Sequence, residues 1–243
     1  MNLDRMIAVR NNKTVFRDGD RCLKVFTEGF SKADVLHEAL NQARIEEIGL
    51  RVPKVLEFTA VDGKWAIASE YISGQTLEQL MQAHPENNAA YLEILVQLQL
   101  EIQSKTCPML APLQDRLTQL IHASDLLATV RYDLCSRAES MSRHGKVCHC
   151  DLVPSNIVLT ADGTPYVLDW SQVTQGSGAA DAVHTYLLLR LHGADAETYL
   201  SLYCEKSGTD RAYVEKWIPI VAAALAVKSS ADDRARLHSW IKL

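Results

Sequence analysis

The hydrophobic and polar positions of the first 72 residues follow a strand pattern at the start. Short runs at Met6–Arg10, Lys13–Arg17 and Arg21–Phe26 are separated by Asn11-Asn12 and by Asp18-Gly19-Asp20. Asn, Asp and Gly tolerate positive φ, so both separators are typical of tight turns. The pattern predicts a three-stranded antiparallel meander at the beginning of the chain.

A helical pattern follows between Ser31 and Gly49. Ser31 suits an N-cap, and glycine is common just beyond a helix end. One side of the predicted helix carries Leu36, Leu40, Ala43 and Glu47, with Val35, Ala39 and Gln42 beside it. Two further strands, Lys54–Thr59 and Trp65–Tyr71, flank an Asp62-Gly63 turn. The first part of the chain therefore predicts five antiparallel strands and one helix.

Helical spacing dominates the chain beyond Ser73-Gly74. Thr76 and Gln79 have the spacing of a capping box. Helices are predicted at Ala89–Ser104, Leu113–Leu127 and Val130–Arg143, and again from about Ala180 onward. They are interrupted by a small predicted hairpin, Ile157–Leu159 and Tyr166–Leu168, around an Asp162-Gly163 turn. We expect a β-rich domain over residues 1–72 and a helical domain over residues 73–243.

The bulk composition restricts the function classes. The 243 residues are 47% hydrophobic and 23% charged, with a net charge of −5, which suits a folded protein with a sizeable core. No Lys/Arg cluster stands out, so we expect no nucleic-acid partner. No apolar run approaches the about 18 residues that a membrane helix needs. The six cysteines show no disulfide framework, which predicts reduced thiols and a cytoplasmic location. The sequence specifies no oligomeric state.

The segment His149–Asn156 carries the most informative polar residues. Asp151 and Asn156 lie five positions apart, just before a predicted strand, and Asp169 closes the partner strand of that hairpin. The hairpin therefore brings Asp169 back beside Asn156. Phosphoryl transfer needs such a group: one carboxylate accepts the proton of the attacking hydroxyl, while a carboxylate and an amide oxygen hold Mg²⁺ against a triphosphate.

These residues resemble the catalytic core of the aminoglycoside phosphotransferase and choline kinase family. The usual family pattern is H-G-D-L-x-P-x-N followed by I-D-W, and this chain has H-C-D-L-V-P-S-N followed by L-D-W. The resemblance implies that Asp151 is the catalytic base and that Asn156 and Asp169 are the Mg²⁺ ligands. It also implies that His149 shapes the loop and that Asp181 braces it.

The resemblance implies an α+β fold of the bilobal protein-kinase-like type. A small five-stranded antiparallel β lobe with one helix would bind the nucleotide. A larger, mainly α-helical lobe would carry the catalytic loop and the substrate site.

The resemblance extends to the β-rich part of the chain. By position, Lys24 should neutralise nucleotide phosphates. Glu38 is the expected ion partner of Lys24, in preference to Glu46-Glu47 near the helix end. The backbone groups of Glu70 and Ile72, in a segment similar to the family's interlobe hinge, should hydrogen-bond adenine.

One segment departs from the family pattern, and another resembles a metal site. The segment Asn11–Thr14, where the family covers the phosphates, has no glycine, although the backbone amides of Asn12–Thr14 would still reach phosphates. This loop leaves GTP open as an alternative to ATP. Cys148-His149-Cys150 suggests metal ligands at first, but alternating residues of an extended segment point to opposite faces, so we favour a packing role.

Two rival functions are weighed against a small-molecule kinase. A protein kinase is disfavoured, because Val153 replaces the usual lysine and Asp169 and Asp181 are only twelve positions apart, which leaves no room for an activation segment. The other rival is a pseudokinase, a nucleotide-binding module without turnover. The glycine-poor loop favours it, and the intact set of motif residues opposes it.

The sequence therefore predicts a phosphotransferase that moves the γ-phosphate of Mg-ATP to a hydroxyl of a small molecule. Aminoglycoside, choline or ethanolamine, sugar and nucleoside-like acceptors all remain open. Candidate acceptor-lining residues are Asp181, His184, Tyr186, Tyr203 and Trp217, and Tyr199 and Trp240 are further candidates for a choline-type cation. Aromatic residues at helical spacing more often belong to a core, which is the favoured interpretation of the aromatic set.

Overall fold

The computed structural model describes residues 5–10 and 13–241, and the chain divides into two compact units. The first unit comprises the chain up to Leu80 together with Ser155–Ser171, and the second comprises Met81–Pro154 and the chain from Gln172 onward. The predicted turn at Asn11-Asn12 lies outside the described residues. The predicted lobe boundary between residues 72 and 73 remains a prediction.

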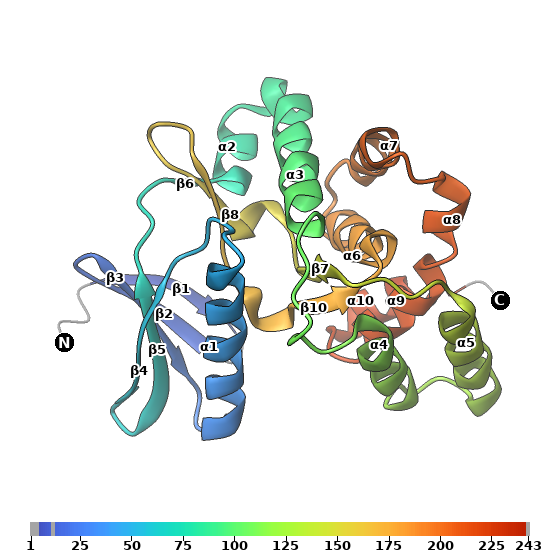
Figure 1. Ribbon diagram of the computed structural model, residues 1–243, viewed down its shortest axis with the longest axis horizontal. Helices are drawn as coiled ribbons and strands as arrows, with labels where there is room; N and C mark the ends of the chain where they lie inside the picture. Colours follow the sequence, from blue (N-terminus) through green and yellow to red (C-terminus); the bar gives the residue numbers. More distant parts are fainter. Residues whose placement is uncertain (1–4, 11–12, 242–243) are drawn as a thin grey trace. The chain divides into compact units, whose positions relative to one another are not determined.

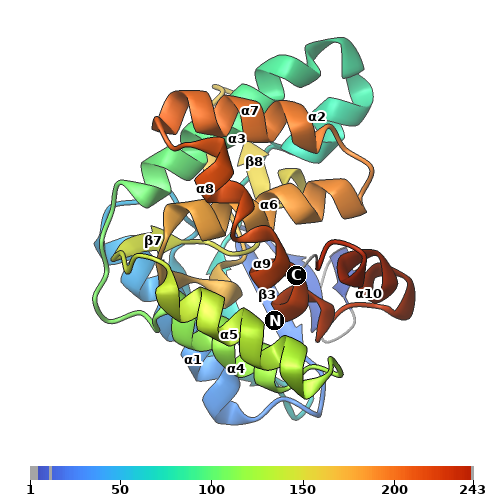
Figure 2. The ribbon, with the colours of Figure 1, turned by 90° about the vertical axis from the view of Figure 1, so that its right-hand side faces the viewer.

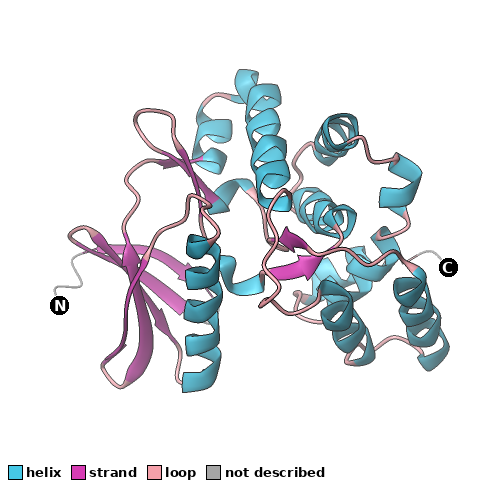
Figure 3. Cartoon of the chain, viewed as in Figure 1, coloured by secondary structure: helices cyan, strands magenta, loops and turns pink. Residues whose placement is uncertain are grey.

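An antiparallel five-stranded sheet forms the centre of the first unit (Figure 1, Figure 3). Its strands are β1 (Arg5–Arg10), β2 (Lys13–Asp18), β3 (Arg21–Phe26), β4 (Val55–Val61) and β5 (Lys64–Glu70). They lie in the order β1-β2-β3-β5-β4, so the predicted meander occupies one side of the sheet and the β4–β5 hairpin the other. The predicted five-stranded sheet with one helix is confirmed.

Helix α1 (Lys32–Glu47) covers the sheet of the first unit (Figure 1). The Ser31 hydroxyl accepts a hydrogen bond from the Asp34 N–H at 3.1 Å and so caps the helix as predicted. Val35 and Ala39, one turn apart, lie on the buried face of the helix. They pack against Phe26 and Ile67 of the sheet. Leu36 and Leu40, on the neighbouring side of the helix, are 41% and 48% exposed.

A second small sheet completes the first unit. It contains β6 (Gln75–Thr76), β8 (Ile157–Leu159) and β9 (Pro165–Val167), in the order β6-β8-β9. The β8–β9 hairpin matches the prediction to within one residue. Strand β6 was not predicted because two residues carry no periodicity. It approaches β8 so closely that a Cβ on Gly74 would lie 2.2 Å from the Leu159 carbonyl oxygen, so only glycine fits there.

The second unit is built mainly from helices (Figure 2). Helix α2 (Leu77–Ala83) begins in the first unit, and the predicted capping box is present at its start, where Thr76 and Gln79 exchange hydrogen bonds of 3.1 and 2.9 Å. The other helices are α3 (Asn88–Gln103), α4 (Leu113–His122), α5 (Ala128–Ser140), α6 (Gly178–Leu191), α7 (Ala196–Ser207), α8 (Arg211–Glu215), α9 (Ile218–Ala226) and α10 (Ala231–His238).

Helix α4 ends five residues earlier than predicted, at His122. The Ser124 hydroxyl donates to the Ile121 carbonyl at 2.7 Å, and Leu127 is 75% exposed, so the apolar spacing that suggested a longer helix has no packing partner there. Helices α4 and α5 then run side by side (Figure 2).

Two short strands, β7 (Lys146–Cys148) and β10 (Thr174–Gly176), pair antiparallel in the second unit and lead into its polar loop. Neither strand was predicted. Across the described residues, no helix combines the length and the apolar character needed to cross a membrane.

Candidate active site

Four charged side chains converge in the first unit, and we call them the charge cluster: Lys13, Lys24, Glu38 and Asp169. Lys24 lies on β3 and its ammonium is 2.5 Å from the Glu38 carboxylate on α1. The same ammonium is 3.3 Å from the Asp169 Oδ1 atom, just after β9. Three residues predicted from distant parts of the sequence are therefore neighbours.

Glu38 is the glutamate of α1 that meets Lys24. The rival Glu46 uses its carboxylate to accept the Val55 backbone N–H at 2.6 Å, at the start of β4. Glu38 lies nearer the middle of α1, where its carboxylate reaches the Lys24 ammonium of β3.

Lys13 is the member of the charge cluster that the sequence analysis missed. Its ammonium lies 2.9 Å from Asp169 Oδ2 and 3.8 Å from Glu38, and its side chain is only 10% exposed. The β2–β3 register pairs Val15 with Lys24. Because side chains alternate along a strand, Lys13 lies on the same face as Val15 and Lys24. This register was the signal that would have identified it.

The charge cluster fixes the ionisation of its members. Burial by itself would raise the pKa of the Asp169 carboxyl, but the Lys24 and Lys13 ammonium ions outweigh burial and hold this pKa well below its usual range. Burial would lower the pKa of the Lys24 ammonium, but Asp169 and Glu38 keep it above its ordinary value. Asp169 is therefore a carboxylate, and Lys24 is a cation, throughout the physiological pH range.

The β8–β9 hairpin places Asn156 beside the residue that precedes Asp169. Ile157 pairs with Val167, and one step further out the Leu168 N–H donates to the Asn156 carbonyl at 2.8 Å. Asn156 is buried at the end of a short 3-10 helix, Pro154–Asn156. An amide and a carboxylate at the open end of one hairpin are a hard-oxygen donor set, which suits Mg²⁺.

Asp169 also has an unusual backbone. Its φ is +58°, in the left-handed region that few residues other than glycine adopt. Such a conformation persists only where the surrounding structure enforces it, and it is common at functional sites.

The predicted catalytic loop lies in the second unit, directly after β7. His149 is fully buried, and its Nδ1 atom accepts the Asp151 backbone N–H at 3.2 Å. Cys150 has a φ of +62° and donates its backbone N–H to the Asp181 carboxylate at 2.8 Å. His149 and Asp181 thus hold the backbone N–H groups of two successive loop residues, Asp151 and Cys150.

Asp181 belongs to a buried hydrogen-bond network that the sequence did not reveal. Its Oδ2 atom accepts from the Gln99 and Gln103 side-chain amides on α3, at 3.0 and 2.9 Å. These amides in turn accept hydrogen bonds from the Tyr199 and Tyr203 hydroxyls on α7. Each pair is spaced by one helical turn, so α3 and α7 present matching polar positions to each other.

Most of the candidate acceptor-lining residues are buried, which agrees with the core role favoured for the aromatic set. Tyr199, Tyr203 and Trp217 are at most 1% exposed, and Tyr186 and His184 are also buried. Asp181 is fully buried by the network above. Trp240 is half-buried, and the Arg190 guanidinium lies 4.6 Å from its ring centre. Helical spacing indicated which residues share a face, but that face points inward.

The hinge-like segment lies at the end of β5. Glu70 is the last residue of that strand and donates its backbone N–H to the Lys54 carbonyl at 3.0 Å. Tyr71, between the two predicted adenine-binding positions, donates to the Asp20 carbonyl at 2.9 Å and carries the Arg17 guanidinium over its ring. Ile72 follows without regular secondary structure. The predicted Asn12 phosphate contact lies outside the described residues.

The cysteines at the start of the predicted catalytic loop are buried packing residues. Cys148 and Cys150 are buried, and the Cys150 thiol lies 3.2 Å from the Thr174 hydroxyl. Burial raises the pKa of the Cys150 thiol to about 12, so it stays protonated at neutral pH. Within the described ranges, no group of three or more His, Cys, Asp and Glu side chains is arranged to hold a metal ion.

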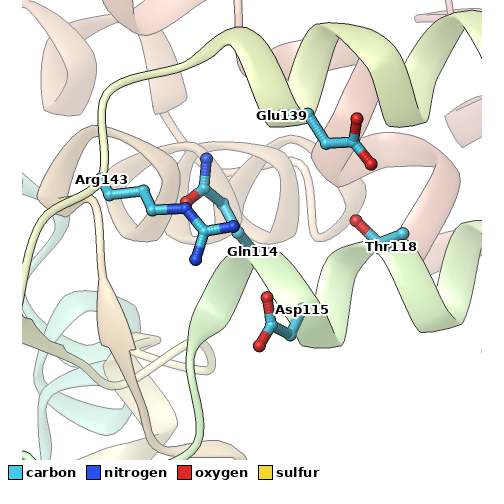
Figure 4. Close-up of a pocket in the computed structure, with 5 residues that line it drawn as sticks. All are labelled: Gln114, Asp115, Thr118, Glu139 and Arg143. Carbon is cyan, nitrogen blue, oxygen red and sulfur yellow. The ribbon is translucent and has the colours of Figure 1, made fainter.

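A polar pocket of about 250 Å³ lies between α4 and α5 (Figure 4). It is lined by Gln114, Asp115, Thr118, Glu139 and Arg143. The Gln114 amide is already occupied by the Ala138 and Met141 carbonyls, at 2.7 and 3.1 Å. The pocket contains none of the predicted site residues. Its lining side chains come from α4, from α5 and from the segment just after α5.

Comparison with known proteins supports the family resemblance. The model of a family described as the phosphotransferase enzyme family matches residues 8–217. No curated protein matches the chain at a significant level.

Solved structures with the same fold share little sequence with this chain. An aminoglycoside-3'-phosphotransferase of type VIII is 17% identical, with a TM-score of 0.67 over 90% of this chain and 93% of that one. A choline kinase, LicA from Streptococcus pneumoniae, is 14% identical, with a TM-score of 0.65 over 96% and 91%. A thermostable mutant of aminoglycoside phosphotransferase APH(4)-Ia, in a ternary complex with AMP-PNP and hygromycin B, is 14% identical, with a TM-score of 0.69 over 98% and 89%.

Proposed function

Since this chain belongs to the phosphotransferase enzyme family, we propose that it transfers the γ-phosphate of Mg-ATP to a hydroxyl group of a small molecule. The family makes the chain a small-molecule phosphotransferase, and the nucleotide and the acceptor are the proposed part. The observation that carries the proposal is the charge cluster, in which the Lys24 ammonium lies 2.5 Å from the Glu38 carboxylate and 3.3 Å from the Asp169 carboxylate.

The first unit supplies the nucleotide site in this proposal. Lys24, fixed by Glu38, neutralises phosphate oxygens, and Asn156 and Asp169 hold Mg²⁺. When bound, the metal neutralises charge on the phosphates and orients them. The backbones of Glu70 and Ile72 bind the adenine ring. Structures of a similar phosphotransferase with AMP-PNP or ADP support an adenine nucleotide, with GTP as the alternative.

The second unit supplies the base. The Asp151 carboxylate accepts the proton of the acceptor hydroxyl as the hydroxyl oxygen forms a bond to the γ-phosphorus. The bond from that phosphorus to the bridging oxygen breaks, and ADP leaves with the bonding electron pair. His149 and Asp181 hold the loop in place, through the Asp151 and Cys150 backbone N–H groups.

The acceptor is a polar alcohol of low molecular weight. Similar structures include an enzyme bound to hygromycin B and a choline kinase, which supports an aminoglycoside or amino-alcohol class. Sugars remain in the same class of hydroxyl acceptors. We propose no aromatic cage in the second unit, because the aromatic residues considered for it are almost all buried.

The test is a panel of candidate alcohols assayed for ADP release, followed by Asp151→Asn on the best substrate. We expect kcat to fall by ~10²–10⁴-fold, the usual contribution of a general base, with the Kd of Mg-ATP nearly unchanged. Asp232→Asn, at an exposed position of α10, is the matched control and should keep the parental rate. Parental turnover by Asp151→Asn would refute the assignment of the base.

A nucleotide-binding module without turnover is the second candidate. One observation favours it: Asp169, the proposed metal ligand, is already paired with two lysines. Tight Mg-ATP binding by thermal shift, together with no ADP release across the whole panel, would support this alternative over the enzyme.

A further inference from the structure

The charge cluster contains one lysine more than the proposed chemistry uses. Lys24 has a close partner in Glu38, at 2.5 Å. Lys13 has Asp169 at 2.9 Å, and its next carboxylate is Glu38 at 3.8 Å. Lys13 therefore has Asp169 as its main counter-charge, whereas Lys24 has both Glu38 and Asp169 within 3.3 Å.

The charges of the cluster balance before any ligand binds. Two ammonium ions face two carboxylates, and all four side chains are largely buried, at 10–23% exposure. A buried ammonium needs an anionic partner, because desolvation of an unpaired charge is costly. Any cation that engages Asp169 therefore takes away the main partner of Lys13, and Lys13 must find another anion nearby.

The position of Lys13 in the sheet indicates which anion replaces Asp169. Lys13 is the first residue of β2 and lies on the same face as Lys24, through the Val15–Lys24 pairing. It directly follows Asn11-Asn12 in the sequence, and no glycine stands between the end of β1 and the start of β2. A connection without glycine is poorly suited to surround phosphates with backbone amides, whereas a lysine ammonium is a compact charge on a flexible stem that reaches them from the side.

We propose that Lys13 is a second phosphate-binding lysine, which pairs with Asp169 in the free protein and transfers to the nucleotide phosphates when Mg-ATP engages Asp169. This inference rests on the proposed function, since it assumes a metal–nucleotide ligand. It deepens that function by naming a group that replaces the missing glycine-rich cover. Binding therefore exchanges one ion pair of Lys13 for another.

The experiment measures dissociation constants by titration for adenosine, ADP and Mg-ATP. Wild type is compared with Lys13→Met, with Lys13→Arg and with Lys64→Met. Lys64 is the matched control, a half-exposed lysine at the start of β5 whose nearest carboxylate is the exposed Glu28 at 3.8 Å. Thermal unfolding of each variant verifies that the fold is retained.

Lys13→Met should weaken Mg-ATP binding by about 10- to 100-fold, the range expected for a charge-assisted hydrogen bond. Adenosine has no phosphate, so its Kd should stay at the wild-type value in the same variant. Lys13→Arg keeps the charge and should recover most of the Mg-ATP affinity. Lys64→Met should bind all three ligands as wild type does.

Three results would overturn the inference. Lys13→Met would bind Mg-ATP as tightly as wild type, or would lose adenosine and Mg-ATP affinity equally, or would bind Mg-ATP more tightly. The last result would make Lys13 a resident cation that blocks the metal site. Failure of the proposed function is distinguishable: wild type would then bind no nucleotide, or would bind it without transferring phosphate to any alcohol.

Discussion

Two residues with left-handed backbones lie at the positions that the proposed chemistry uses. Asp169 has a φ of +58° and Cys150, which precedes the proposed base, has a φ of +62°. The family pattern has glycine at the position of Cys150, and the positive φ explains that preference physically, because glycine has no Cβ to clash. In this protein Cys150 adopts the left-handed conformation despite its Cβ, and its buried thiol contacts the Thr174 hydroxyl.

Substitutions at Cys150 should reveal this strain. Cys150→Gly relieves about 1 kcal/mol of left-handed strain but gives up the packing of the thiol, so its free energy of unfolding should stay within about 1 kcal/mol of wild type. Cys150→Val adds a β-branched side chain where φ is positive and should lose at least about 2 kcal/mol. Urea unfolding measures both.

Cys204→Val, in the helical backbone of α7, is the control for the exchange of cysteine for valine and should change stability little. A Cys150→Val variant as stable as Cys150→Gly would show that the left-handed conformation imposes no constraint at this position.

At the scale of elements, the loop before the proposed base is held by helices far away in the sequence. Asp181 on α6 receives the Cys150 N–H and two amides of α3, and α7 supplies the tyrosine hydroxyls behind them. Every donor in this hydrogen-bond network is buried, so the loss of one partner leaves a hydrogen-bonding group of its neighbour unsatisfied. The network therefore couples helix packing to the position of the loop.

Mutations in this network should affect the position of the loop that carries Asp151 without affecting the binding of Mg-ATP. Tyr203→Phe removes the hydroxyl that donates to Gln103 at 2.9 Å and should cost about 1 kcal/mol of stability. Asp181→Ala removes the carboxylate that accepts from the Cys150 N–H and from the Gln99 and Gln103 amides, and should cost about 2–4 kcal/mol. Both should lower kcat, Asp181→Ala more, with the KM for Mg-ATP unchanged, because the residues proposed to bind the nucleotide belong to the first unit.

Steady-state kinetics and urea unfolding check this prediction. Tyr132→Phe, at a 75% exposed position of α5, is the control and should be neutral in both measurements. A rise in KM with kcat unchanged in the Asp181 variant would contradict a positioning role.

The same elements show how far a single sequence predicts this fold. Strands β3 and β8 have the predicted bounds, and α1 has its predicted cap, because periodicity and turn chemistry are local signals. Strands β7 and β10 were missed because each has three residues and pairs with a segment about 28 positions away. The role of Lys13 in the charge cluster was missed for a related reason: it depends on the β2–β3 register, which the spacing of residues does not state.

At the scale of the whole molecule, the family and the nucleotide chemistry are better defined than the acceptor. The motif residues of this chain are few and chemically constrained, and they follow the family pattern although the solved structures reported above are only 14–17% identical to the chain. The acceptor has no such motif in this sequence, and helical spacing does not distinguish a ligand-facing aromatic residue from a core one. The buried Tyr199, Tyr203 and Trp217 illustrate this limit of periodicity.

The central claim is a transfer of phosphate to an alcohol, and phosphorus NMR of a complete reaction tests it most directly. Wild-type protein is incubated with Mg-ATP and a panel of aminoglycosides, amino alcohols and sugars. We expect a phosphate monoester to appear with one acceptor class, in equal amount to ADP, and not to form in a parallel reaction where EDTA chelates the metal from the start. ADP formed only with inorganic phosphate, or no consumption of ATP with any acceptor, would contradict the account.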